Sequence, residues 1–308
     1  MVSNQNQIPV YCLYESWIYS EEAMNICKAA FRVTLAFPLI IVLASAADAP
    51  KLTFRFKEVK FPGAAGTTAY GVNNSGVIVG QYLDQKGVFH GFMLDRGKGT
   101  AIDDPNGTDT LCAGINSSGA IVGQYTAPSG DNHGFLYEKG RFTDITPDKL
   151  SGASGINDKG DIVGGYAHCQ LCQQHGFLWN GHKYKRLDVP GAQWTGAGSI
   201  NNQGVITIIA PDDSNFYHSY LYRQGKYTEV KVPGAYETFV EDINNSDDLA
   251  LIWDDDKQNN HGALRYKGLF YKFDYSKGVS TDVFGLNDHH LIIGDYGVLS
   301  GGAFKATF

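Results

Sequence analysis

The sequence predicts an all-β fold, a six-bladed β-propeller with about 43 residues in each four-stranded blade. Three observations carry this prediction. One short pattern recurs six times at a nearly constant interval. Each interval contains four stretches with β-strand character, separated by turn-forming residues. The two ends of the repeat region complete one another as a single unit.

The recurring pattern is clearest at Gly114–Tyr125, which reads GINSSGAIVGQY. Its asparagine marks the six copies: Asn73, Asn116, Asn157, Asn201, Asn244 and Asn287. The intervals between these markers are 43, 41, 44, 43 and 43 residues. A fixed period in the forties that contains several short strands is typical of propeller blades.

Each repeat unit contains four expected strands. In the second unit, Thr110–Ile115 forms the first strand, and the turn at 116–119 leads into a β-branched second strand at 120–125. His133–Tyr137 and Arg141–Ile145 follow as the third and fourth strands. Asn and Gly tolerate the positive φ that hairpin turns require. A lone sheet would leave both faces wet, so we expect neighbouring units to stack into a ring.

The ends of the chain predict how this ring closes. The last unit has its first strand at Asp282–Leu286, its second at Leu291–Tyr296 and its third at Gly301–Lys305, and then the chain stops. Phe54–Val59 matches the fourth strand of another unit, Tyr227–Val232. We therefore expect the N-terminal strand to pair in the last blade, which removes exposed sheet edges. The first strand of each unit then lines the channel.

The first part of the chain resembles an export signal. An apolar run at 36–43 follows Lys28 and Arg32 and precedes a small-residue cleavage site at Ala44–Ala46. A retained single-pass anchor is the alternative, although the run is short for a membrane span. The expected divisions are a possibly mis-annotated leader at 1–23, a signal peptide at 24–46 and one propeller domain at 47–308. The protein is then periplasmic or secreted, with no stable membrane span after cleavage.

The composition limits the classes of partner that this protein is expected to bind. The chain has a formal charge of −7 and no run rich in Lys and Arg, so nucleic acid is not an expected partner. The expected partners are a small molecule, a glycan or an extracellular protein, and we expect a monomer. No Gly-x-Ser-x-Gly elbow, phosphate loop or dinucleotide fingerprint occurs in the sequence.

The repeat resembles that of a known group, the bacterial extracellular HAF family. The resemblance rests on the GIN pattern, on His-Gly-Phe-Leu-Tyr at 133–137 and on Pro-Gly-Ala at 62–64, 190–192 and 233–235. It covers residues 54–308, and the fourth and fifth units depart from it most. It implies a repeat architecture and export, and it implies little about chemistry.

Acidic residues interrupt the repeat near the expected axis. Two places before the marker asparagine stand Gly71, Gly114, Gly155, Ser199, Asp242 and Gly285. Glu241 and Asp242 break this run of small residues, and Asp282 enters the next innermost strand. Carboxylates beside a channel predict a Ca²⁺ site, or a general base whose pKa is raised by burial. In either case His289 or His290 is expected nearby. Pairing with basic residues or contact with solvent is the alternative.

For the other candidate side chains we favour structural roles over functional ones. Five histidines (His90, His133, His175, His218 and His261) open the third strand of five units, and we interpret them as hydrogen-bond partners of neighbouring loops. Cys169 and Cys172 predict a small disulfide, with a metal site or free thiols as alternatives. The acidic run Asp254–Asp256 predicts a solvated loop, with surface calcium as its alternative.

Aromatic residues in the connections between units are the remaining signal. Trp194, Tyr236 and Phe239 are expected near one mouth of the channel, where they can stack on a flat ligand or pack in the core. Two functional hypotheses follow. The first is an exported binding module that uses one mouth of the channel. The second is a calcium-dependent hydrolase of lactones or esters, in which Glu241, Asp242 and Asp282 hold the ion.

Overall fold

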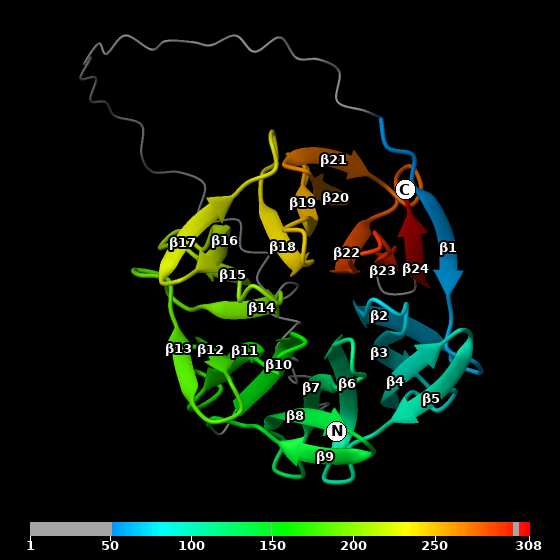
Figure 1. Cartoon of the computed structure of the whole chain (residues 1–308), viewed down its shortest axis with the longest axis vertical. Helices are drawn as coiled ribbons and strands as arrows, with labels where there is room; N and C mark the ends of the chain where they lie inside the picture. The colour runs from blue at the N-terminus through cyan, green and yellow to red at the C-terminus, as the bar shows by residue number, and fades with distance from the viewer. Residues whose placement is uncertain (1–50, 149, 298–301) are drawn as a thin grey trace, which may run out of the picture. The chain divides into compact units, whose positions relative to one another are not determined.

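Twenty-four β-strands make up the part of the chain that the computed structural model describes, residues 51–148, 150–297 and 302–308. The predicted leader at 1–23 and signal peptide at 24–46 lie outside the described residues. From Leu52 onward, six four-stranded antiparallel sheets surround a common axis (Figure 1), so the predicted six-bladed propeller is confirmed. No helix in the described part is long and apolar enough to cross a membrane.

The blades follow the chain in order, and each runs from its innermost to its outermost strand. Blade 1 contains β2 (Gly66–Val72), β3 (Ile78–Leu83), β4 (Phe89–Asp95) and β5 (Lys98–Ile102). Blade 2 contains β6 (Thr108–Ile115), β7 (Ile121–Thr126), β8 (Asn132–Glu138) and β9 (Arg141–Asp144). Blade 3 contains β10 (Leu150–Ile156), β11 (Ile162–Ala167), β12 (His175–Trp179) and β13 (Tyr184–Leu187).

The remaining blades have the same order. Blade 4 contains β14 (Gly196–Ile200), β15 (Ile206–Pro211), β16 (Tyr217–Arg223) and β17 (Lys226–Val230). Blade 5 contains β18 (Thr238–Ile243), β19 (Leu249–Asp254), β20 (Asn260–Tyr266) and β21 (Leu269–Phe273). Blade 6 contains β22 (Thr281–Leu286), β23 (Ile292–Tyr296), β24 (Gly302–Thr307) and β1 (Arg55–Val59).

Blade 6 confirms the predicted closure. Strand β1 pairs antiparallel with β24, from Arg55 opposite Thr307 to Val59 opposite Ala303. The first described strand of the chain therefore becomes the outer strand of the last blade (Figure 1). This pairing gives β24 a partner on each side, so neither of its edges is exposed.

The hydrophobic core lies between the blades in six similar clusters. One cluster joins Phe92 and Val72 of blade 1 to Ile293 and Ala303 of blade 6. The Ile-Val-Gly pattern of the second strand explains this packing. A Cβ on Gly80 would lie 2.8 Å from the Phe92 ring and 2.0 Å from the Thr68 carbonyl oxygen, so only glycine fits beneath the buried ring.

The marker asparagines form a closed belt of hydrogen bonds around the axis. Each side-chain amide donates to the backbone carbonyl of the next marker, at 3.1, 3.1, 3.2, 3.2, 3.4 and 2.9 Å around the ring. Each side-chain oxygen also accepts from two backbone amides of its own turn, as Asn116 does from Ser118 and Ala120. Each marker asparagine therefore has two roles: its side-chain oxygen stabilises its own turn, and its side-chain amide links its blade to the next.

Candidate functional site

The innermost strands carry a β-bulge at the same place in all six blades. The register shifts between Val240 and Asp242 in blade 5 and at the equivalent positions of the other blades. The residues at the bulges are Tyr70, Ala113, Ser154, Gly198, Glu241 and Phe284. Five of these six are partly exposed although they lie at the centre of the ring, so they face the channel. Bulges commonly re-aim side chains beside functional sites.

The channel wall has two unlike arcs. The small-residue arc spans blades 2 to 4, with Ala113, Ser154 and Gly198 at its bulges. The large-residue arc spans blades 5, 6 and 1, with Glu241, Phe284 and Tyr70. The Phe284 and Tyr70 rings lie 5.3 Å apart, centroid to centroid. Charge and aromatic surface are therefore gathered on one side of the channel.

Asp242 fastens three blades of the ring together. Its carboxylate accepts hydrogen bonds from the Ser199 hydroxyl of blade 4 and from the backbone amide of Leu286 in blade 6, the latter at 2.7 Å. It also accepts from the amide of Ile243 at 2.8 Å. Burial raises the pKa of Asp242 to about 6 against these opposing hydrogen bonds. Because both oxygens are engaged, the contacts of Asp242 are those of a structural residue.

Glu241 belongs to a group of carboxyl groups that disfavour one another's ionisation. Burial raises its pKa to about 8, and the charges of Asp282 and Asp242 add to the effect. Burial and the charges of Glu237 and Asp282 raise the pKa of Asp254 to about 7. At neutral pH, Glu241 is therefore largely protonated.

Asp295 extends this acidic cluster toward blade 1. It lies opposite Asp282 in the β22–β23 pair. Burial raises its pKa to about 7, while hydrogen bonds from Thr68 and the Ala69 amide oppose the shift and the charge of Asp282 supports it. Asp282 itself accepts a hydrogen bond from the Asn260 side chain at 2.8 Å. We call Glu241, Asp254, Asp282 and Asp295 the acidic cluster.

Two oxygens of the acidic cluster are buried without a hydrogen-bond partner, Oδ1 of Asp254 and Oδ1 of Asp295. Only 9% of Asp254 is exposed, so the expectation of a solvated loop for this residue was wrong. Asp254 ends β19, where its backbone exchanges hydrogen bonds with Tyr236 and Glu237 in the connection that leads into β18. Within the described residues, no salt bridge joins Glu241, Asp254 or Asp295 to a basic side chain. Glu241, Asp254 and Asp295 therefore have no basic partner among the described residues.

The predicted calcium set does not fit a metal site. Across residues 51–148, 150–297 and 302–308, no group of three or more His, Cys, Asp or Glu side chains is arranged to hold an ion. A role for Asp242 as a ligand would also require it to give up its blade-linking hydrogen bonds. Calcium therefore contributes no step to the functions proposed below.

The two histidines predicted beside the channel lie in the turn between β22 and β23. The His290 ring packs 5.0 Å from Tyr266 and 4.9 Å from Phe308, and its Nε2 lies 3.8 Å from a carboxylate oxygen of Asp248. His289 is exposed, and its backbone amide donates to Asn287. None of these contacts involves the acidic cluster, so the structure does not bring the histidines together with it.

The predicted aromatic residues form a row across the connections of blades 4 and 5. The Trp194 ring lies 5.9 Å from Tyr217, which lies 5.8 Å from Phe239. Tyr236 packs against Phe216 at 5.2 Å and remains 45% exposed. Phe239 is buried, so it packs beneath Tyr217 and is not itself available to a ligand. We call Trp194, Tyr217, Phe239, Phe216 and Tyr236 the aromatic row.

Glu237 connects the aromatic row to the acidic cluster. Its carboxylate accepts a hydrogen bond from the Tyr217 backbone amide at 2.8 Å, and its charge acts on Asp254. Burial raises the pKa of Glu237 as well. Antiparallel connectivity places the second-to-third-strand loops and the connections between blades on one mouth, which we call the loop mouth. The row and the outer end of the cluster share this mouth.

The repeated histidines and the cysteines have local structural partners. Nδ1 of each histidine lies 2.7–3.2 Å from a carboxylate at the end of the fourth strand, in the pairs His90–Asp103, His133–Asp144, His175–Asp188, His218–Glu229 and His261–Asp274. This confirms their interpretation as hydrogen-bonding residues. Cys169 and Cys172 form the predicted disulfide, with 5.0 Å between their Cα atoms. Cys112 is buried, and burial raises the pKa of its thiol well above the usual range.

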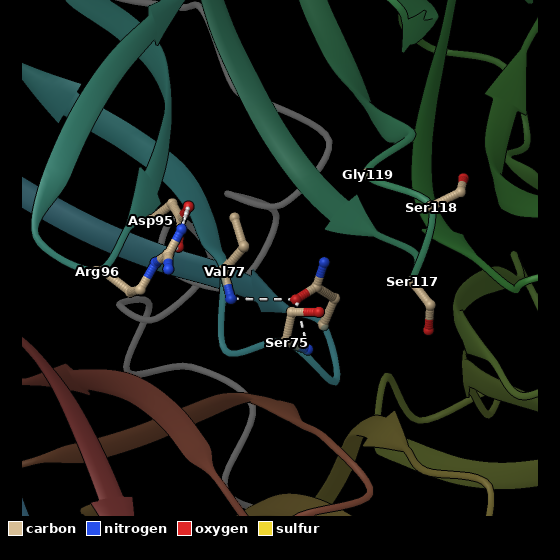
Figure 2. Close-up of a pocket in the computed structure, with 8 residues that line it drawn as sticks. Ser75, Val77, Asp95, Arg96, Ser117, Ser118 and Gly119 are labelled. Carbon is tan, nitrogen blue, oxygen red and sulfur yellow. Dashed lines mark hydrogen bonds and ion pairs between the residues drawn. The ribbon is translucent and has the colours of Figure 1, made fainter.

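A shallow hollow of about 480 Å³ lies on the opposite mouth, between the turns of blades 1 and 2. Figure 2 shows Ser75 and Val77 on one side of it, Ser117, Ser118 and Gly119 on the other, and Asp95 and Arg96 beside it. Arg96 is paired with Asp95 at 3.1 Å, so the hollow presents no free cation of its own. It offers fewer recognition groups than the loop mouth.

Comparison with known proteins supports the fold. No protein-family model and no protein of curated function matches this sequence. The β-propeller domain of the trilobed protease from Pyrococcus furiosus is similar in structure, with a TM-score of 0.53 and 9% identity over 77% of this chain and 80% of that chain. AofleA from Arthrobotrys oligospora aligns with a TM-score of 0.50 and 11% identity, over 82% and 86% of the two chains.

TolB from Acinetobacter baumannii is a further structural neighbour. Its TM-score is 0.50 with 10% identity, and the alignment covers 79% of this chain and 64% of TolB. Identities this low show a shared propeller architecture and carry no residue of the acidic cluster from one protein to another.

Sequence reasoning singled out Glu241 and Asp282 as site residues, assigned Asp254 to a solvated loop and missed Asp295. The signal for both was present in the second strand. The position of Asp295 is occupied by Gln81, Gln124, Gly165, Ile209 and Ile252 in the other blades. Asp254 similarly replaces Leu83, Thr126, Ala167 and Pro211. Aligning the second strands as well as the first therefore reveals all four carboxylates as departures from the repeat.

Proposed function

We propose that this protein is a binding module that takes a ligand at the loop mouth over blades 4 to 6. One observation carries the proposal: Asp254 has a buried carboxylate oxygen without a hydrogen-bond partner, and it lies beside the aromatic row at one mouth of the channel. Perturbed carboxyl groups in a concave site, next to aromatic surface, are typical of ligand sites. They also cost stability, which is the usual sign of a functional constraint.

Exposed apolar side chains support the same mouth. Within the described residues, the large hydrophobic side chains that are most exposed are Val88, Phe89, Leu171, Tyr184, Tyr236 and Leu269. Four of them (Val88, Phe89, Leu171 and Tyr236) lie in or beside loops of the loop mouth. Leu171 is 99% exposed on the loop that the Cys169–Cys172 disulfide closes. Exposed apolar groups rimmed by polar ones are common where a protein meets a partner.

The expected setting of this function is outside the cytoplasm, with a glycan, a small molecule or an extracellular protein as the ligand. The resemblance of the repeat to HAF-family proteins and the signal-like segment at 24–46 support this setting. Mass-spectrometric identification of the N-terminus of the exported protein tests it. A first residue near Ala47 is expected, and a chain that remains in the cytoplasm with its leader contradicts it.

Ligand screening tests the binding function. We expect the labelled propeller to retain ligands from a glycan microarray or a small-molecule library, and we expect Trp194→Ala and Tyr236→Ala to weaken that binding. Leu269→Ala is the matched control, because Leu269 is as exposed as Tyr236 but lies on an outer strand. Binding that survives both loop-mouth variants but is lost in Arg96→Ala, on the other mouth, contradicts the proposal.

Hydrolysis of a lactone or ester is the second candidate. The observation that favours it is Glu241, whose pKa of about 8 keeps a proton available at neutral pH for general acid catalysis. A lactonase assay on the wild type and on Glu241→Gln, with and without chelator, tests it. Turnover that Glu241→Gln abolishes and chelator leaves unchanged supports hydrolysis, and turnover that Glu241→Gln leaves unchanged contradicts it.

A further inference from the structure

We infer that the loop mouth recognises its ligand through a primary ammonium group, which the carboxylate of Asp254 binds beside Asp282. This inference rests on the proposed binding function and specifies the chemical class of the ligand. The body of the ligand lies against the aromatic row. The neighbouring positions of these groups and the unmet hydrogen-bonding capacity of Asp254 carry the inference.

The strand geometry directs Asp254 toward Asp282. Ala250 and Leu264 of blade 5 pack with Val283 of blade 6. Side chains alternate along a strand, so Asp254, four residues after Ala250, lies on the same face of blade 5. Asn260 lies opposite Asp254 in the β19–β20 pair, and its side-chain amide reaches Asp282. Asp254 and Asp282 therefore face the same space between blades 5 and 6.

The carboxylate of Asp254 is buried with unused hydrogen-bonding capacity. It is more than nine-tenths buried, and its Oδ1 has no donor among the described residues. A buried carboxylate without a partner costs free energy, which a cationic donor offsets when it binds. An ammonium group has three donors and no acceptor, so it can serve several carboxylates at once.

The chemistry of the site favours an organic cation over a metal ion. The carboxylates of the described residues do not converge closely enough to coordinate a metal. An ammonium group forms hydrogen bonds of ordinary length and does not require tight, regular coordination. Aromatic rings next to the cluster also favour a cation with an organic body, because rings attract cations and stack on flat groups.

Binding of a cation must release protons from the cluster. The titratable groups whose charges act on Asp254 or on Glu241 are Glu237, Asp242, Asp255, His261 and Asp282. All but His261 are acidic, so together they favour the protonated forms of Glu241 and Asp254 in the free protein. An ammonium group favours the ionised forms instead. Affinity should therefore rise as the pH rises from 6 to 8.

Four small probes separate the charge from the body of the ligand. Tyramine and 6-amino-6-deoxyglucose each carry an alkyl ammonium group, on an aromatic and on a sugar body respectively. Tyrosol and glucose are their neutral counterparts. Isothermal titration at pH 7 measures the affinity of each probe, and titration in phosphate and in Tris buffer measures proton release. We expect at least one amine to bind, to bind about tenfold or more tightly than its neutral counterpart, and to release protons.

Matched variants locate the ammonium group. Asp254→Asn preserves the shape of the side chain and removes its charge, and we expect it to weaken amine binding about tenfold or more. Asp213→Asn removes the same charge from an exposed position in the neighbouring blade and should change little. Glu241→Gln should reduce the proton release, which gives a second readout if Asp254→Asn fails to fold.

The outcomes are distinct. Equal binding of the amines and their neutral counterparts overturns the ammonium inference and leaves the binding function standing. Failure of both amines to bind at millimolar concentration overturns it as well, while the glycan and small-molecule screen still tests the binding function. An Asp213→Asn variant as weak as Asp254→Asn also overturns it, because only the long-range field of the acidic loops would then be at work.

Discussion

Two parts of the channel wall, the strands around Gly155 and those around Asp242, solve one packing problem in different ways. In the small-residue arc, neighbouring innermost strands approach so closely that a Cβ on Gly155 would lie 2.8 Å from the Ser199 Cα atom. Around the same circle, Ser199 and Asp242 replace glycine and bridge the strands with side-chain hydrogen bonds. Direct backbone contact is therefore replaced by a polar link between blades 4, 5 and 6.

This difference has a consequence for stability. Glycine leaves no charge at the axis, whereas Glu241, Asp242, Asp254 and Asp295 bring carboxyl groups whose pKa values lie between about 6 and about 8 into a confined space. The small-residue arc is optimised for closure. The large-residue arc combines closure with groups that destabilise the free protein and that a ligand can satisfy.

Removal of the blade-linking carboxylate should have the largest effect. Asp242→Ala leaves the Leu286 and Ile243 amides and the Ser199 hydroxyl without their acceptor. We expect a loss of about 3–5 kcal/mol in the free energy of unfolding, measured by urea denaturation at pH 7. Asp242→Asn keeps one acceptor oxygen and should lose less. A loss below 1 kcal/mol for Asp242→Ala, about that of an average surface change, would show that the arcs do not differ in this way.

The pH dependence of stability should report the acidic cluster. The folded-state pKa values of Asp254, Asp295 and Glu241 lie above their usual values near 4, so the folded protein binds more protons than the unfolded chain between these limits. Stability from these groups is present below about pH 4 and is lost progressively up to about pH 8. Each of these groups contributes about 1.4 kcal/mol per pH unit over its range, so we expect a loss of more than about 3 kcal/mol between pH 5 and pH 8, measured by urea denaturation.

The matching control neutralises part of the cluster. Asp254→Asn and Asp295→Asn together should flatten the curve between pH 5 and pH 8 and raise stability at pH 8. Asp213→Asn should leave the curve unchanged, because its carboxylate is exposed. Stability that rises between pH 5 and pH 8 in the wild type would mean that the cluster is compensated in solution.

The contribution of each marker asparagine to stability should be the same in both arcs. Asn157 and Asn244 each donate to the next marker carbonyl and accept from two amides of their own turn. We expect Asn157→Ala and Asn244→Ala each to cost about 2 kcal/mol in urea denaturation. Similar losses would confine the contrast between the arcs to the bulges, and a much larger loss at Asn244 would extend it to the turns.

Local chemistry explains why most of the fold was predictable. The Asn-x-x-Gly turns, the alternating second strands and the match of Phe54–Val59 to another fourth strand are short-range patterns, and they predicted the blades and their closure. The coupling of Asp254 and of Glu241 to Asp282 depends on a residue of the next blade. Sequence position placed Asp254 in a loop because a run of three aspartates is usually solvated.

A second belt of hydrogen bonds runs beside the asparagine belt and is interrupted at one step. Repair of this interruption should have the smallest effect on stability. The residue after each marker donates its amide to the side chain of the equivalent residue one blade on, in five of the six steps. The step from Asn74 to Ser117 has no such bond among those of the described residues, because serine is too short to supply the acceptor. The hollow in Figure 2 lies at this step.

Ser117→Asn should complete this second belt. An amide oxygen at this position can accept from the Asn74 amide, as Asp158 accepts from Ser117 at 2.8 Å in the next step. We expect a gain of about 0.5–1 kcal/mol in urea denaturation, since the bond is partly exposed. Asp158→Ser is the reciprocal change and should lose a similar amount by opening the belt between blades 2 and 3. If Ser117→Asn stabilises the protein and leaves ligand binding unchanged, then closure of the ring and recognition at the loop mouth are separable functions of opposite mouths.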